Sequence, residues 1–238
     1  MDASSLFFDF SRSFLFTIAT LLPMLNPPAA APIFLTLTEG ASSTARSRLS
    51  KKVAINIFIM LTVAMVAGHV VLNFFGISLP IIRIGGGLLV IATAWRLVSA
   101  SDFDAEQAQD MAESYSWEQV RSKAFYPLTF PMLCGPGSLS AALTVGATLH
   151  DSSAAVGATK LAGAIPAVAV ACFIVYLCLR FASQFLYRLG SNGTAVVMRL
   201  SAFILLCLGV QIVWDGLSEL TISLLVEAAA RVASYYFF

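Results

Sequence analysis

The sequence contains two proline-rich segments, PMLNPP at residues 23–28 and PMLCGP at residues 131–136, and each lies in the middle of a long apolar stretch. At this offset of 108 residues, six residues are identical between positions 23–36 and 131–144. Proline removes a backbone donor and glycine weakens a helix, so both segments predict a break in a helix. A lipid bilayer tolerates such a break only where the freed backbone groups are buried in protein or line a cavity. A matched pair of breaks in two halves of a chain indicates the binding site of a secondary transporter.

The composition indicates an integral membrane protein. Hydrophobic residues make up 58% of the 238 residues and charged residues 11%, whereas an ordinary soluble domain has about 25% charged residues. The apolar runs are long enough to cross a hydrocarbon core about 30 Å thick. We predict six spans, at about 13–38, 53–75, 77–100, 124–149, 159–183 and 194–216. The net charge of +1 gives no reason to expect a nucleic-acid partner, and the lipid bilayer is the expected environment.

The distribution of charge predicts the orientation of the spans. The linker 39–52 carries four basic residues against one acidic residue: Arg46, Arg48, Lys51 and Lys52 against Glu39. Positive loops stay in the cytoplasm, so with six spans both termini are expected outside it. Asp2 and Asp9 occupy the place where a secretory signal would carry positive charge, so we expect the first span to be retained.

Two halves of three spans each are expected, 1–100 and 121–216, joined by a cytoplasmic linker at 101–120. An odd number of spans per half inverts the second half relative to the first, which is the plan of many transporters. A weaker match at an offset of 116, Arg83 with Arg199 and Leu89 with Leu205, supports this interpretation. The predicted fold class is therefore an all-α membrane protein with two inverted three-helix repeats, in which helices 1 and 4 are discontinuous at the membrane midplane. Residues 217–238 are expected to form a C-terminal interfacial segment anchored by aromatic residues.

The predicted breaks have a chemistry suited to a zwitterion. Asn26 followed by Pro27 is typical of an N-cap with a first-turn proline, and Gly135-Pro136 can open the equivalent half-helix. We expect each half-helix to present unpaired N–H groups and a partial positive charge, which suits a carboxylate. The helices expected at about 13–25 and 124–133 would end in carbonyls that can receive an ammonium group. The irregular region is expected to reach about Ala31, because Pro32 opposes the carbonyl of Pro28.

The predicted substrate-binding residues are mostly small, which favours a small neutral amino acid over a bulky or charged one. They are Asn26, Pro27, Pro28, Ala29, Ala30, Cys134, Gly135, Pro136, Gly137 and Ser138. Close helix packing is the alternative explanation for such small residues. Gly137 and Ser138 are expected to bound the pocket together with Ala29 and Ala30.

For the histidine, arginine, glycine and cysteine residues within the predicted spans, we expect mainly structural roles. His69 is a candidate for proton coupling, although a structural role or a polar partner is the more common explanation for such a histidine. Gly85-Gly86-Gly87 is expected to be a packing surface, and Arg83 and Arg199 are expected to reach toward the interface. The four cysteines fall within predicted spans, where inert packing is expected. No motif predicts a metal site or a cofactor.

Several segments resemble the MarC family of bacterial inner-membrane proteins. The resemblance is carried by the run from Leu22 to Pro28, by FGISLP at residues 75–80 followed by RIGGG at 83–87, and by Gly135-Pro136-Gly137. It covers nearly the whole chain except the extreme C-terminus. The resemblance implies six spans in a bacterial inner membrane and, for some members, proton-coupled transport of glycine and alanine. Other members are linked to antibiotic resistance or proposed as exporters, so the resemblance leaves substrate and direction open. Cys134 departs from the small polar residue expected at its position.

Other functions remain as alternatives. An exporter of another small metabolite or drug would have the same architecture. A water or small-solute channel could also pair inverted halves, but only one half here contains Asn-Pro. An enzyme is not expected, because the sequence has no His-Glu-x-x-His or Gly-x-Ser-x-Gly motif.

Overall fold

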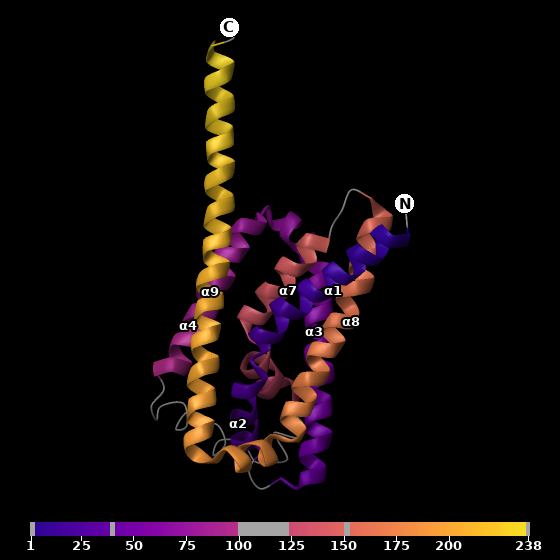
Figure 1. The fold of residues 1–238 in the computed structure, drawn as a ribbon, viewed down its shortest axis with the longest axis vertical. Coiled ribbons are helices and arrows are strands. Elements are labelled where there is room, and N and C mark those ends of the chain that lie inside the picture. Colours follow the sequence, from indigo (N-terminus) through magenta and orange to yellow (C-terminus); the bar gives the residue numbers. More distant parts are fainter. Residues whose placement is uncertain (1–2, 39–40, 100–123, 150–152, 237–238) are drawn as a thin grey trace.

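A computed structural model describes residues 3–38, 41–99, 124–149 and 153–236, and these residues form helices without any strand. Figure 1 shows the helices gathered in one bundle, beyond which the C-terminal part of the last helix projects. In chain order they are α1 (Ala3–Leu25), α2 (Pro27–Leu37), α3 (Ser43–Phe75), α4 (Leu79–Ser99), the wide-turned segment η1 (Ala124–Leu133), α7 (Pro136–Leu149), α8 (Ala154–Arg180) and α9 (Ala182–Tyr236). The predicted all-helical class is confirmed.

Four stretches of the described chain are long and apolar enough to cross a membrane. They are Ser4–Leu35, Ser43–Gly68, Ala155–Arg180 and Ala195–Ala229. Shorter apolar helices, Leu79–Trp95 and Gly137–Leu149, occupy the third and fourth predicted spans. The fourth is short because its helix begins only after the break that precedes Pro136.

Both predicted helix breaks are present. In the first half, Asn26 alone separates α1 from α2 and adopts a positive φ of 42°. In the second half, Cys134 and Gly135 separate η1 from α7. The first break is shorter than predicted, because α2 continues as a helix across Pro32. Membrane helices can contain an internal proline where neighbouring groups satisfy the freed carbonyl.

The segment before the second break is not the regular half-helix that the sequence analysis expected at 124–133. Tyr126 (φ −119°, ψ 128°) and Phe130 (φ −118°, ψ 132°) have extended backbone angles inside η1. Each of these residues directly precedes a proline, Pro127 or Pro131. Because the proline ring disfavours helical angles in the preceding residue, the two prolines unwind this segment twice.

The connections also differ from the predictions at several places. Most of the predicted linker 39–52 is helical, since α3 begins at Ser43. Arg46, in the first turn of α3, donates from Nε and Nη2 to the Thr38 carbonyl at 3.3 and 3.2 Å, which satisfies the C-terminal end of α2. A kink at Gly190 (φ 66°) replaces a longer loop before the sixth predicted span. The linker 101–120 lies outside the described residues.

Each helix packs closely against one or a few others. The most extensive contact is between α4 and α9. In the rest of the bundle α1 packs against α8, and α3 packs against α7, η1 and α8. Glycines bring the first of these pairs together: a Cβ on Gly87 would lie 2.8 Å from the Gly209 carbonyl oxygen. The α4–α9 pair contacts the other helices mainly where α2 meets α9 and where α7 meets α4. Consequently, the two half-helices that follow the breaks join this pair to the rest of the bundle.

Candidate substrate site at the helix breaks

The two breaks lie against each other in the folded chain. Ser138, in the first turn of α7, donates from its hydroxyl to the Met24 carbonyl in the last turn of α1, over 3.3 Å. These residues are 114 positions apart in the sequence. The packing therefore brings the two proline-rich segments of the two halves to one place.

Asn26 opens α2 by a different means from the predicted one. Its backbone carbonyl accepts hydrogen bonds from the N–H groups of Ala29 and Ala30, both at 3.1 Å, so it does occupy the N-cap position. Its side chain, however, makes no capping hydrogen bond; its Nδ2 is buried and has no partner among the described residues. What the position requires of Asn26 is a positive φ, which asparagine adopts far more readily than most residues.

The N–H donors of the two half-helices are unequal, which the sequence analysis did not anticipate. At α2, Pro27 and Pro28 have no N–H, and those of Ala29 and Ala30 are bound to the Asn26 carbonyl. The prediction of unpaired donors at this helix is therefore wrong, and the buried Asn26 amide is the donor that remains there.

The second half-helix retains its donors. Leu139 N–H is bound to the Gly135 carbonyl at 3.2 Å, but the backbone N–H groups of Gly137 and Ser138 have no partner among the described residues. Two free N–H groups in the first turn of a helix form a local site for an anion.

The carbonyl ends are less available than expected. The Pro23 carbonyl accepts from the Asn26 N–H at 3.1 Å, and the Met24 carbonyl accepts from Ser138. The irregular course of η1 also prevents a row of aligned carbonyls at its end. Around the breaks, free N–H groups at the start of α7 are therefore better represented among the described residues than free carbonyls.

The small residues at the breaks are closely packed. Ala29, Ala30, Cys134 and Ser138 expose no more than 5% of their surfaces. A Cβ on Gly137 would lie 2.8 Å from Cγ2 of Val90 on α4, so this predicted pocket wall is also a surface for helix packing. In this arrangement α4 covers the start of α7.

Thr129 organises the second break, and the sequence analysis did not single it out. Its backbone carbonyl accepts from the Cys134 N–H at 2.8 Å, while its hydroxyl donates to the Ala124 carbonyl at 2.9 Å. Asn56 on α3 donates from Nδ2 to the same hydroxyl at 3.3 Å, which joins α3 to this segment. In the sequence, the signal that could have pointed to Thr129 is its place two residues before Pro131.

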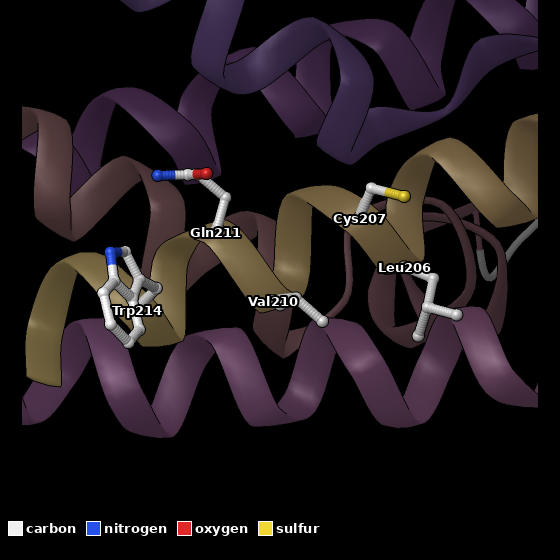
Figure 2. A pocket seen from close by; sticks show the side chains of 5 residues that line it. All are labelled: Leu206, Cys207, Val210, Gln211 and Trp214. Carbon is white, nitrogen blue, oxygen red and sulfur yellow. The ribbon is translucent and has the colours of Figure 1, made fainter.

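A separate hollow of about 370 Å³ lies beside α9. Figure 2 shows its lining side chains spread along one helix, and none of them is a predicted site residue: Leu206, Cys207, Val210, Gln211 and Trp214. Gln211 donates from its side chain to Asp215 one turn further on, at 2.8 Å. The hollow is open and mainly apolar, as expected of a surface covered by lipid chains.

The remaining candidates have mixed outcomes. His69 belongs to α3, but its side chain lies outside the described part of the structure, so proton coupling stays a prediction. Gly86 and Gly87 are buried packing positions as predicted, whereas Gly85 faces open space. Arg83 forms an ion pair with Glu219 of α9 rather than only reaching toward the interface. All four cysteines are free thiols, two of them buried.

Comparison with known sequences decides the family. Residues 11–221 match the profile of the MarC family integral membrane proteins. The chain belongs to the MarC family. Relatives named "UPF0056 inner membrane protein MarC" are 32% identical over 206 residues in Salmonella arizonae and in Salmonella typhimurium, and 30% identical over 205 residues in Escherichia coli O1:K1. Each alignment covers 85% of this chain and 93% of the relative.

No solved structure matches the fold. The names of the MarC relatives and the apolar helices together identify a multi-pass protein of the inner membrane. This agrees with the family resemblance noted in the sequence.

Proposed function

We propose that this MarC-family protein is a secondary transporter that moves small neutral amino acids, namely glycine, alanine and serine, across the inner membrane. The observation that carries the proposal is the contact between the two breaks, where Ser138 of α7 donates to the Met24 carbonyl of α1. Broken helices that meet inside a membrane bundle are the usual construction of a transporter's substrate site.

The proposed site binds the substrate carboxylate at the start of α7. The backbone N–H groups of Gly137 and Ser138 are unpaired among the residues that the structure describes, and the helix dipole adds a partial positive charge there. Asn26 contributes a buried amide that lacks a partner, and it lies two residues after the carbonyl that Ser138 contacts. These donors would recognise an anionic oxygen without any charged side chain.

The tight packing around the breaks supports a small substrate. Ala29, Ala30 and Cys134 are buried, so opening the site by a modest helix movement creates little space beside the carboxylate. Glycine and alanine have the least side chain to accommodate.

The helix pairing supports the inverted-repeat architecture with six spans that we propose for this function. If the halves are related by a half-turn, α2 corresponds to α7 and α4 to α9. The observed contacts of α2 with α9 and of α7 with α4 are then equivalent. The basic residues of the first connection lie in the first three turns of α3, and they support an orientation with both termini outside the cytoplasm.

The deciding experiment is uptake of labelled glycine into proteoliposomes, with and without a pH gradient. Unlabelled alanine and serine should compete, whereas glycine methyl ester should not, because it lacks the carboxylate. Inhibition by the ester as strong as that by glycine would exclude the proposed anion site. Osmotic swelling without saturable uptake would instead indicate a channel. If the protein instead exports another metabolite, glycine should not be transported in either direction across the vesicle membrane. We expect no catalytic activity in any of these assays.

A further inference from the structure

The last helix continues well past its final contact with the bundle. Gly216 packs against the Pro80 carbonyl at the start of α4, and Glu219 forms the ion pair with Arg83. Beyond this level Figure 1 shows the yellow end of α9 projecting alone, as far as Tyr236. The match to the MarC family also ends at residue 221. The projecting part is therefore an addition to the common bundle.

The projecting part has one narrow polar stripe and a wide apolar surface. Glu219, Ser223 and Glu227 follow each other at intervals of four residues and so line one side of the helix. The apolar residues between them expose 61% to 65% of their surfaces: Ile222, Leu224, Leu225 and Val226. At 3.6 residues per turn these four residues cover about 200° of the circumference.

Neither water nor a second copy of the helix suits such a surface. The 17 residues from Leu220 to Tyr236 would extend about 25 Å into solvent if α9 stayed straight. A two-stranded coiled coil covers only a narrow seam and would leave much of the apolar arc exposed. A bilayer surface covers a wide arc and leaves the opposite stripe in water. Because α9 is attached to a bundle in the membrane, its projecting part always lies near the surface of the bilayer.

The helix has a feature that favours bending at the place where it leaves the bundle. Thr221 donates from its hydroxyl to the Leu217 carbonyl at 2.8 Å, and Ser223 donates to the Leu220 carbonyl at 2.7 Å. Threonine and serine bonded back to the preceding turn in this way weaken and bend helices. Two of them follow directly after the ion pair that fixes Glu219.

From these observations we propose that α9 bends at residues 220–223 and that residues 222–236 lie along the surface of the lipid bilayer. Leu225 then faces the acyl chains and the stripe through Glu227 faces water. This inference does not depend on which substrate the protein carries.

The test compares two labels two residues apart on opposite sides of the helix. Leu225→Cys and Glu227→Cys are made in a chain whose accessible cysteines, Cys178 and Cys207, are replaced by alanine, while the buried Cys134 and Cys172 are shielded from reagents. Each variant is labelled with an environment-sensitive fluorophore and reconstituted in phosphatidylethanolamine–phosphatidylglycerol vesicles. We expect blue-shifted emission quenched by a lipid-borne quencher at position 225, and quenching by aqueous iodide at position 227.

Two results would overturn the proposal. Iodide quenching of equal strength at both positions would mean that the helix projects into water. Shielding of position 225 from both quenchers, together with thiol cross-linking between two chains, would mean that a second copy covers the helix. Folding of each variant is checked by its elution as a single species before reconstitution.

Discussion

At the scale of single residues, Asn26 has two separable roles. Its backbone must adopt a positive φ so that Pro27 can begin a new helix, and its side-chain amide is buried with no partner in the described ranges of the chain. A buried amide with no partner is unfavourable by itself, so a ligand that supplies an acceptor would stabilise it. Alanine and glycine at this position distinguish the two roles, because only glycine tolerates the backbone angle.

Replacement of Asn26 by alanine should therefore lower the free energy of unfolding by about 1–2 kcal/mol, the difference between the left-handed and ordinary conformations of an L-residue. Asn26→Gly should have a smaller effect on stability, since glycine populates positive φ freely. If the amide binds the carboxylate, both variants should raise the KM for glycine about tenfold or more. Thermal unfolding and uptake kinetics provide the two measurements. An unchanged KM in Asn26→Gly would show that the amide does not bind the substrate.

A second residue-scale prediction concerns the contact between Gly137 and Val90. A Cβ on Gly137 would meet Cγ2 of Val90 at 2.8 Å, whereas the next nearest atoms of Val90 are 3.8 and 3.9 Å away. Gly137→Ala should therefore destabilise the bundle by about 1–3 kcal/mol through overpacking. Adding Val90→Ala removes Cγ2 and should restore both stability and uptake. Failure of the double variant to recover uptake, with normal folding, would indicate that Gly137 contacts the substrate directly.

At the scale of helices, the sequence predicts some breaks and misses others for identifiable reasons. The breaks at Asn26 and at Cys134–Gly135 were predictable because proline and glycine act locally. The unwinding at Tyr126 and Phe130 is also encoded locally, because each of these residues precedes a proline, which disfavours helical angles one position upstream. The loss of donors at α2 follows likewise from two successive prolines at its start.

The contacts between helices could not be predicted in the same way. The hydrogen bond from Ser138 to Met24 and the packing of Gly137 on Val90 depend on how each helix rotates about its axis. Hydrophobic periodicity fixes that rotation for a helix with one apolar face, but a membrane helix is apolar nearly all round. The pairing of Arg83 with Glu219 also depends on how α4 and α9 rotate about their axes. The two residues are 136 positions apart in the sequence, so no local pattern predicts their contact.

At the scale of the whole molecule, α4 and α9 form one packed unit that touches the rest mainly through α2 and α7. The breaks lie at the boundary between this unit and the remaining helices. Alternating access by rocking of one group of helices against another requires such a boundary at the substrate site. We expect α4 and α9 to move together and α4 to separate from α7 during transport.

Disulfide cross-linking can test this movement in the chain that retains only the two buried cysteines. Val90→Cys with Gly137→Cys places two Cβ atoms about 3.9 Å apart across the moving boundary, a distance suited to a disulfide. Oxidation should abolish glycine uptake and reduction should restore it. The control pair, Arg83→Cys with Glu219→Cys, replaces the ion pair within the α4–α9 unit and is joined by a short bis-maleimide. This cross-link should leave uptake intact; arrest by both cross-links would mean that α4 also slides against α9.

The unequal donors of the two half-helices have a consequence for how occupancy of the site can be followed in time. Pro27 and Pro28 carry no amide hydrogen, and those of Ala29 and Ala30 are held by the Asn26 carbonyl. Gly137 and Ser138 carry amide hydrogens that have no partner within the described part of the chain. When α4 and α7 open, these two amides should exchange with deuterium rapidly, and bound glycine should slow them while leaving α2 unaffected. The deuterium exchange rate of one short peptide would then report how much of the protein has substrate bound, separately from the global opening of the bundle.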